Sequence, residues 1–263
     1  MAFKWCGRKK WIVKKLHSTE EIFEPFCGSA EVSFSLSEKC HLNDVLQPLV
    51  DVYHSLTSNR SAFLGDLKTI FSDFNQAADA KDYFYQIRDE FNQGGQSDPV
   101  LFSAILMSGF NGLWRQGPSG CTVTYGGKRS LKIESFESIP VGKIASLRCQ
   151  EWDTLQVPND RCLIYCDPPY TNTHNAYVSR GWSFNDDRML ICQMSNVKNP
   201  VIISMNWSDI AEKELQSSGF TVKTVTRNFH VGGPNVKRAV EIVAFNDRAS
   251  SLVRTDPGTF DER

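Results

Sequence analysis

The chain has 263 residues, of which 41% are hydrophobic and 22% are charged, and its formal net charge is −1. This size and composition indicate a globular protein with one core of ordinary size, or one core with an inserted subdomain. The balanced charge excludes nucleic-acid binding through bulk electrostatics, so any basic contact with a nucleic acid must be local. We expect no membrane span and no signal peptide, because no apolar run approaches the roughly 18 residues that a span needs. The eight cysteines form no C-x-x-C pair and the five histidines are scattered, so we expect no metal site and a reducing, intracellular compartment.

The first part of the chain has the order helix, strand, turn, helix, strand. A short helix over residues 8–16 precedes a strand over residues 22–26, a turn of small residues, a helix from about Glu31 and a short strand that ends before Asp44. Asp44 lies 20 residues after Glu24 (44 minus 24). An acid about 20 residues into a strand–turn–helix–strand pattern is typical of nucleotide-binding βαβ units, so the pattern predicts parallel strands and a nucleotide site.

Between residues 50 and 108 the pattern becomes helical. Apolar residues recur at helical spacing over residues 63–74 and again over residues 83–91. A third helix follows over residues 98–107, where an Asp-Pro pair supplies a cap and a first turn. None of this supplies a parallel strand, so we expect an inserted helical subdomain, followed by a glycine-rich loop or hairpin over residues 109–128.

The strand pattern returns in the second half of the chain. The strands expected there cover residues 147–152, 163–166, 201–204, 220–226 and 239–245. Ser208 can cap a helix that Gly219 ends. The last two strands are joined by a glycine-rich connection too short for a helix, so they must be antiparallel. The sequence therefore predicts a mostly parallel sheet that ends in an antiparallel hairpin, with a polar, fraying tail after Asn246.

The most informative stretch is Asp167, Pro168, Pro169 and Tyr170, directly after the strand over residues 163–166. Two prolines fix two φ angles and remove two N–H donors, so the strand stops at the sheet edge where open α/β sheets bind ligands. An exocyclic aromatic amine is a weak nucleophile, because its lone pair is delocalised into the ring. The Asp167 carboxylate and the Pro168 carbonyl can each accept an N–H of such an amine, and Tyr170 can stack on a base taken out of a duplex. A tight turn with a solvated aspartate would use the same residues, so the motif alone leaves both interpretations open.

Residues spread over nearly the whole chain carry a resemblance to a known family. They are Lys4-Trp5-x-Gly7-x-Lys9, Glu24-Pro25-Phe26-Cys27-Gly28-Ser29-Ala30, Asp44, Asn111-Gly112-Leu113-Trp114-Arg115, Asp167-Pro168-Pro169-Tyr170 and Val240-Glu241-Ile242. In this order they resemble the Dam-type (alpha-group) DNA adenine-N6 methyltransferases. The resemblance implies the α/β class I SAM-dependent methyltransferase fold: a Rossmann-like, mostly parallel seven-stranded sheet with an antiparallel terminal hairpin and an inserted target-recognition subdomain. It divides the chain into a catalytic domain (1–55 and 144–247), a helical target-recognition subdomain with a DNA-reading hairpin (56–143) and a flexible tail (248–263).

The resemblance also implies a reaction and a set of residues. The reaction is site-specific transfer of a methyl group from S-adenosylmethionine to the amine of a flipped-out adenine in double-stranded DNA, with S-adenosylhomocysteine as product and no metal. The implied catalytic residues are Asp167, Pro168, Pro169 and Tyr170, and the implied cofactor-binding residues are Trp5, Lys9, Glu24, Phe26, Gly28, Asp44, Trp152 and Asp167. Lys9 would pair with the cofactor's carboxylate, Trp5 would shield its sulfonium, and Asp44 would accept both ribose hydroxyls. Ala30 stands where the family usually has a second glycine, and alanine fits there with a negative φ.

The expected DNA contacts come from the glycine-rich segment and the terminal hairpin. They are Asn111, Arg115, Thr124, Lys128, Arg129, Lys237 and Arg238. Arg115 matches a family arginine that reads a base edge, and we expect it to bind guanine through a bidentate fork. Many family members that act on GATC carry proline where this chain has Thr124, and Trp114 is bulky. Both differences argue against GATC, so the recognition sequence stays open between GATC and another sequence. We expect a monomer or weak dimer with no obligate protein partner, in the cytoplasm of a bacterial cell or a phage-infected host.

Two other functions fit the same residues. Related Asn-Pro-Pro-Tyr and Ser-Pro-Pro-Tyr sequences serve other amines, such as an RNA base, the N4 of cytosine, guanine or a protein glutamine. Aspartate at position 167, together with Trp5 and Lys9, favours adenine in DNA. The alternative from another class is a DNA-binding reader that has lost catalysis, against which the intact motif at residues 167–170 argues.

Overall fold

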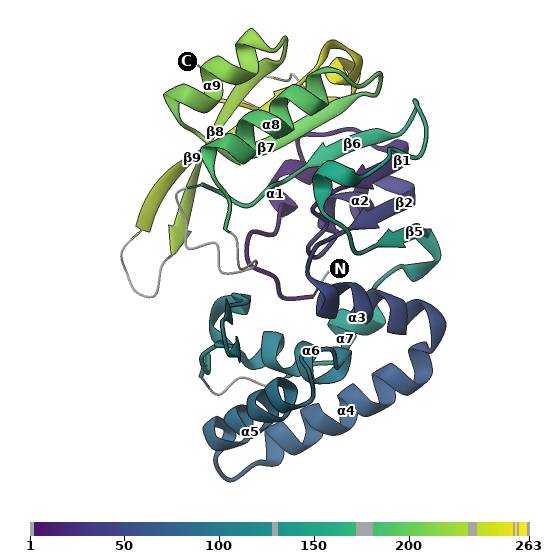
Figure 1. The fold of residues 1–263 in the computed structure, drawn as a ribbon, viewed down its shortest axis with the longest axis vertical. Coiled ribbons are helices and arrows are strands. Elements are labelled where there is room, and N and C mark those ends of the chain that lie inside the picture. Colours follow the sequence, from purple (N-terminus) through teal and green to yellow (C-terminus); the bar gives the residue numbers. More distant parts are fainter. Residues whose placement is uncertain are drawn as a thin grey trace.

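A sheet of seven strands forms the larger of two lobes (Figure 1). The computed structural model describes residues 3–127, 131–171, 181–230, 236–254, 256 and 258–261, and of residues 228–230, 236 and 237 it describes the backbone alone. The strands are β1 (Thr19–Glu24), β2 (Ser37–Asn43), β5 (Ile144–Arg148), β6 (Leu163–Cys166), β7 (Val201–Asn206), β8 (Thr221–His230) and β9 (Val236–Phe245). Their order across the sheet is β5-β2-β1-β6-β7-β9-β8. The run from β5 to β7 is parallel, and β9 is antiparallel to both β7 and β8, which confirms the predicted parallel sheet with an antiparallel terminal hairpin.

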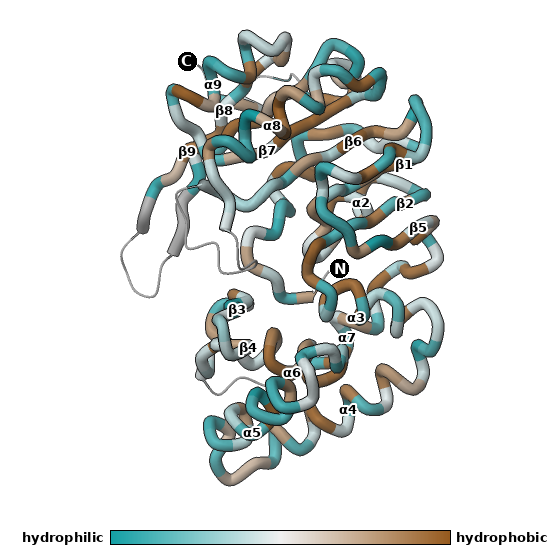
Figure 2. Tube along the Cα trace, in the orientation of Figure 1, coloured by the Kyte–Doolittle hydropathy of each residue, from teal (hydrophilic) through white to brown (hydrophobic). Residues whose placement is uncertain are grey.

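Helices cover both faces of this sheet. One face packs against α1 (Lys10–Val13), α2 (Glu31–Leu36) and the 3-10 helix η4 (Asp247–Leu252). The other packs against α8 (Phe184–Ser195) and α9 (Asp209–Ser217). Because both faces are covered, a central strand such as β6 is buried along its whole length and its sequence is a continuous apolar run. Figure 2 shows this hydrophobic character in the central strands β6 and β7.

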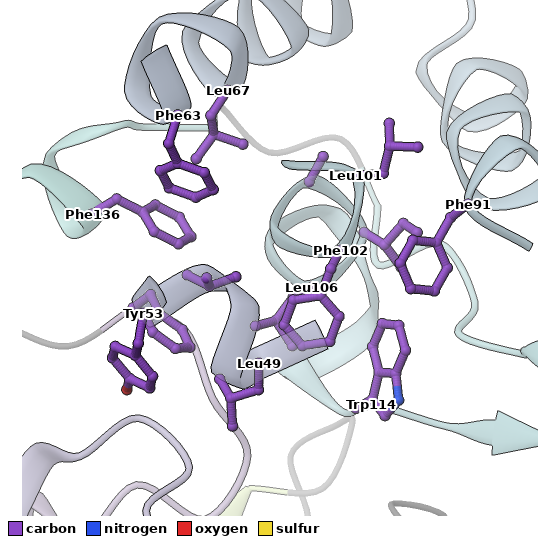
Figure 3. Close-up of a cluster of buried hydrophobic side chains, with 14 of the residues drawn as sticks. Leu49, Tyr53, Phe63, Leu67, Phe91, Leu101, Phe102, Leu106, Trp114 and Phe136 are labelled. Carbon is purple, nitrogen blue, oxygen red and sulfur yellow. The ribbon is translucent and has the colours of Figure 1, made fainter. Parts of the chain in front are cut away.

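The smaller lobe is helical. Its elements are α3 (Gln47–Ser58), α4 (Arg60–Gln76), α5 (Ala80–Gln93), α6 (Pro99–Ser108), η1 (Phe110–Gly112), the two-stranded β3 (Gln116–Gly117) and β4 (Gly120–Cys121), α7 (Glu134–Glu137) and η2 (Val141–Lys143). Asp79 and Asp98 cap α5 and α6 by accepting N–H groups of their first turns. The cap at Asp98 was predicted, whereas α5 begins three residues before the apolar pattern that starts at residue 83. Apolar side chains of α3 to α7 converge on one cluster, shown in Figure 3. The predicted helical insert is therefore confirmed.

The two lobes share part of their cores. The cluster of the helical lobe also contains Cys40 and Leu42 of β2. The hydroxyl of Tyr53 on α3 donates to the carbonyl of Gly28 at 2.9 Å, which joins α3 to the loop after β1. Residues 3–9 run between the lobes (Figure 1), where the ring of Phe3 stacks on that of Phe136 at a centroid distance of 5.3 Å. The relative position of the lobes is thus held by buried contacts.

Some predicted boundaries are wrong, each for a physical reason. The helix over residues 8–16 is reduced to the four residues of α1, because Leu16 forms a β-bridge with Val253. The strand over residues 147–152 is β5, which begins and ends earlier. There the side chain of Asn43 donates to the carbonyl of Gln150 and accepts from its N–H, at 3.0 and 3.1 Å, so side-chain bonds replace the backbone ladder.

The sequence predicted a tail that frays after Asn246, but the start of this tail is folded. Residues 247–252 form η4, Ala249 is fully buried, and Val253 is nearly so. The N–H of Arg254 donates to the carbonyl of Lys15 at 2.8 Å, so this segment is fastened to the start of the chain. The sequence also did not predict α8, which begins with a capping box between Ser183 and Asp186. None of the helices in the described part of the chain has the length and apolar character needed to cross a membrane.

Candidate active site at the carboxyl end of the sheet

A cavity of about 930 Å³ lies at the carboxyl ends of β1, β2 and β6. It is lined by the segment before α1, the loops after β1 and β2 and the residues after β6, with Leu113 of the helical lobe on its far side. Many of the predicted site residues line it together: Trp5, Lys9, Glu24, Phe26, Gly28, Asp44, Arg115, Trp152, Asp167, Pro168, Pro169, Tyr170 and Arg238. The parallel order of the strands explains this, since their carboxyl ends meet at one edge of the sheet.

Asp167 follows β6 and is held by two neighbours. The ammonium of Lys9 lies 2.6 Å from Oδ1 of Asp167, and the hydroxyl of Ser204 donates to the same oxygen at 3.1 Å. Burial raises the pKa of Asp167, while the Lys9 ammonium acts in the opposite direction. The catalytic carboxylate expected from the sequence is therefore in the cavity, and its orientation is set by a buried lysine.

Lys9 makes contacts within the protein that the sequence did not predict. Its side chain is almost completely buried, and its ammonium donates to the hydroxyl of Tyr170 at 2.7 Å as well as pairing with Asp167. The same ammonium lies 4.8 Å from the centre of the Tyr170 ring. Lys9 thus links the segment before α1 to both ends of the Asp-Pro-Pro-Tyr motif.

Glu24, at the end of β1, is a buried carboxylate. Burial raises its pKa to about 8, and the nearby charges of Asp44 and Asp167 act in the same direction. One of its oxygens accepts the backbone N–H of Ser33 at 2.7 Å, which partly offsets this. Because Asp44 and Asp167 both hinder the ionisation of Glu24, a positively charged ligand at this place would be favoured.

Asp44, at the end of β2, is held by the backbone. Its Oδ2 accepts the N–H of Gly28 at 2.9 Å and its Oδ1 accepts the N–H of Leu46 at 3.0 Å. Burial raises its pKa. Each carboxylate oxygen still has a lone pair for a further donor, so Asp44 can accept ligand hydroxyls in a fixed orientation.

The turn between β1 and α2 requires a left-handed backbone. Gly28 has a φ of +47°, and a Cβ at this position would lie 2.6 Å from Nε1 of Trp5, so only glycine lets the indole lie against the loop. Ala30 has a φ of +50°, so the expectation of a negative φ there is wrong. Ala30 is fully buried and precedes α2, so packing holds it in a conformation that costs alanine about 1–2 kcal/mol.

Aromatic rings form one wall of the cavity. The ring of Phe26 lies 6.1 Å from that of Trp152 and 5.4 Å from that of Trp182, in tilted and edge-to-face arrangements. Trp152 is buried in a 3-10 turn after β5, not at a strand end. The sequence did not identify Trp182, because only the fold brings the segment before α8 beside β1; its indole N–H donates to Asp187 at 2.8 Å.

The predicted DNA contacts divide into several groups. Arg115 and Arg238 are exposed at the cavity, on opposite lobes, while Asn111 and Thr124 are exposed on the helical lobe outside the cavity lining. Lys128 and Arg129 lie outside the described residues, and only the backbone of Lys237 is described.

Trp114, considered as a bulky residue near the DNA, lies in the core of the helical lobe. It is fully buried, with its ring 4.5 Å from that of Phe102 (Figure 3). The segment that precedes it is tied to the segment before α1. Nζ of Lys4 donates to the carbonyl of Gly109 at 2.7 Å, and the N–H of Cys6 donates to the carbonyl of Gly112 at 3.1 Å.

The thiol that precedes the catalytic motif is not an activated one. Cys166 precedes Asp167 but is fully buried, and burial raises the pKa of its thiol, which disfavours the reactive thiolate. Within the described residues, no group of three or more His, Cys, Asp or Glu side chains could hold a metal ion.

Comparisons with known proteins agree with the geometry of the site. A sequence model of the family described as D12 class N6 adenine-specific DNA methyltransferase matches residues 8–231. The chain is 26% identical to the Retron Ec67 DNA adenine methylase of Escherichia coli, over 97% of this chain and 93% of that protein. It is 26% identical to a DNA adenine methylase of Vibrio cholerae, over 95% and 92%, and 24% identical to that of Escherichia coli strain K12, over 92% and 93%. Among solved structures, a putative RNA methyltransferase, PH1948 from Pyrococcus horikoshii, has a TM-score of 0.40 and 9% identity over 90% of this chain and 78% of that one, a similarity too low to carry an argument.

Proposed function

This chain belongs to the D12 class N6 adenine-specific DNA methyltransferases, and from that premise we propose that it methylates an adenine turned out of duplex DNA at the cavity around Asp167. Relatives named DNA adenine methylase align over nearly the whole chain. The chain is accordingly an adenine-specific DNA methyltransferase. The observation that carries the proposed site is the Asp167 carboxylate, held at the cavity by Lys9 and followed by two prolines that cannot donate backbone hydrogen bonds.

The cavity fits S-adenosylmethionine, which supplies a methyl group on a positively charged sulfonium when bound. The carboxylates of Glu24, Asp44 and Asp167 favour a cation, and the aromatic wall favours a planar base. We assign to the cofactor Trp5, Lys9, Glu24, Phe26, Gly28, Asp44, Trp152 and Asp167. Asp44 would accept the ribose hydroxyls, because its backbone contacts hold it at the end of β2 as in nucleotide-binding sheets.

Asp167 acts on the amine of the target adenine. Lys9 and Ser204 both bind Oδ1, and in the described part of the chain Oδ2 has no recorded partner, so it can accept an N–H of the amine. The carbonyl of Pro168 accepts the second N–H. Both contacts localise the nitrogen lone pair and offset the positive charge that develops on the nitrogen as it forms its new bond. Because the leaving thioether needs no acid, catalysis consists mainly of positioning, and we propose that it needs no metal.

The DNA would lie between the two lobes. Arg115 and Arg238 face the cavity from opposite sides, and a bidentate arginine fork such as that of Arg115 suits guanine. Asn111 and Thr124, with Lys128, Arg129 and Lys237, would add base or phosphate contacts. We assign target recognition to residues 56–143, with α3, which spans the boundary at residue 56, as the connection to the catalytic domain. Monomers or weak dimers would act in the cytoplasm of a bacterial cell or a phage-infected host, where such DNA is found.

Radiolabelled methyl transfer tests this function. The wild-type chain should label mixed-sequence duplex DNA, and single-molecule sequencing of a methylated genome should map the label to adenines in one sequence context. Asp167→Ala should lose turnover by about 100-fold or more, since removing one preorganised electrostatic group costs on that order. Circular dichroism at the assay temperature should show that the variant is folded. A variant that keeps more than about a tenth of the wild-type kcat would refute the role of Asp167. Label on single-stranded RNA in place of duplex would refute the proposed substrate.

A further inference from the structure

Glu241 is a buried carboxylate for which the reaction described above has no use. It lies on β9, opposite Asn206 of β7 and Val225 of β8, and is 1% exposed. Burying a carboxylate in the middle of a sheet costs several kcal/mol unless charged partners and hydrogen bonds compensate it. The residues that contact Glu241 therefore indicate the role of its buried negative charge.

Those partners connect β8 to the active site. Nη1 of Arg227 lies 2.8 Å from Oε1 of Glu241, and the hydroxyl of Tyr170 donates to Oε2 at 2.9 Å. The ammonium of Lys9 lies 3.9 Å from that same oxygen. The carboxylate of Glu241 thus meets both an arginine behind the site and the tyrosine of the catalytic motif.

The hydrogen bonds at Tyr170 have a defined direction. Lys9 carries only donors, so the Tyr170 hydroxyl accepts from Lys9 at 2.7 Å and must point its own proton elsewhere. Glu241 accepts that proton. Because the hydroxyl donates to Glu241 and accepts from Lys9, Tyr170 and Lys9 hold each other in place. The ammonium of Lys9 then lies 2.6 Å from Oδ1 of Asp167.

The charges of this group are balanced. Lys9 and Arg227 carry two positive charges, and Asp167 and Glu241 carry two negative charges. Without Glu241, the half-buried Arg227 would lose its carboxylate partner, and the hydroxyl of Tyr170 would lose the acceptor that Glu241 supplies. Lys9 would keep Asp167 and the carbonyl of Gly7, at 3.4 Å, but the Tyr170 hydroxyl would no longer be held beside it, so Lys9 and Asp167 could move from the productive geometry.

We propose that Glu241, anchored by Arg227, is a positioning residue: it fixes Tyr170 and Lys9, and through them sets the orientation of Asp167 toward the amine. This proposal rests on the proposed function of Asp167. A purely structural pair between β8 and β9 would stabilise the hairpin without affecting methyl transfer, and the two roles give different measurements.

The test is Glu241→Gln, measured by single-turnover methylation of duplex DNA under saturating S-adenosylmethionine. Glutamine has one acceptor oxygen where glutamate has two, and it carries no charge, so Arg227 and Tyr170 cannot both keep a charge-assisted hydrogen bond. We therefore expect the rate constant to fall about 10- to 100-fold. The dissociation constant of DNA should stay within about threefold of wild type, because Glu241 acts on the chemical step; that of S-adenosylhomocysteine is measured alongside, because Lys9 is also assigned to the cofactor. An unchanged rate, or a loss found only in the dissociation constants, would overturn the proposal.

A double-mutant cycle identifies the path of the effect. Tyr170→Phe removes the hydroxyl that joins Glu241 to Lys9, so Glu241→Gln should slow the Tyr170→Phe enzyme by no more than about threefold. Losses that multiply would show that Glu241 acts by another route and would overturn the proposal. Thr224→Val is the matched control, because Thr224 is buried on β8 opposite Ile242 but belongs to none of these contacts, and it should leave the rate unchanged.

A second variant covers the case in which Glu241→Gln does not fold. Glu241→Asp keeps the negative charge for Arg227 but is shorter by one methylene, so it cannot reach both partners at their present distances. It should unfold near the wild-type temperature and still lose about tenfold in single-turnover rate; a wild-type rate would overturn the proposal. A wild-type chain that methylates no adenine would instead refute the proposed function itself.

Discussion

Glu24→Gln is expected to change how the stability of the ligand-free protein depends on pH. Glu24 is fully buried at the end of β1, and its pKa is raised from 4.5 to about 8. Glutamine has nearly the same shape and keeps an oxygen that can accept the N–H of Ser33, at 2.7 Å in the wild type. The substitution therefore removes the titration and preserves most of the packing.

The sign follows from proton binding in the folded and unfolded states. Above about pH 4.5 the unfolded chain has released the Glu24 proton, whereas the folded chain keeps it until about pH 8. The unfolded state thus binds fewer protons over this interval, and the free energy of unfolding of the wild type falls as pH rises. The contribution of Glu24 is fully present below about pH 4.5 and is lost by about pH 8. The whole shift corresponds to about 5 kcal/mol, at 1.36 kcal/mol for each pKa unit, which is an upper limit because the folded state can relax around the charge.

Urea unfolding between about pH 5 and about pH 8.5 measures this effect. The difference in free energy of unfolding between Glu24→Gln and wild type should grow with pH, by several kcal/mol over the range. Effects of other groups that titrate equally in both proteins cancel in this difference. Glu20→Gln is the matched control, because Glu20 is exposed on the same strand, and its difference should stay within about 0.5 kcal/mol at every pH. A difference that is flat or that shrinks with rising pH would refute the reasoning.

Two further predictions concern the cofactor loop and DNA reading. Gly28→Ala places a Cβ at a φ of +47° and 2.6 Å from Nε1 of Trp5, so it should cost at least about 1–2 kcal/mol in urea unfolding and weaken S-adenosylhomocysteine binding in a fluorescence titration; wild-type values for both would contradict the described turn. Arg115→Ala should lose about 1–3 kcal/mol of discrimination at one base pair, roughly 5- to 150-fold in relative methylation rate between duplexes that differ there. An equal loss on all duplexes would instead indicate a phosphate contact.

Much of the site could be predicted from the sequence because its parts are local. Two prolines after an apolar run end a strand wherever they occur, so the motif at residues 167–170 had to lie at a sheet edge. The 3.6-residue periodicity of the insert and the cap at Asp98 located its helices in the same way. Ala30 was the local exception, because burial overrides the backbone preference of alanine.

The sequence by itself thus determined the order of the elements and which residues reach the carboxyl edge of the sheet, since strand ends, turns and caps depend on near neighbours in the chain. Only the tertiary structure decided which charges pair there. Tyr170 meets Glu241 because the sheet order puts β9 beside β7, which is itself beside β6, and Lys9 meets Asp167 because the segment before α1 lines the same cavity. Such pairings depend on the burial of groups far apart in the sequence, where an unpaired charge is too costly to remain, and no local pattern records them.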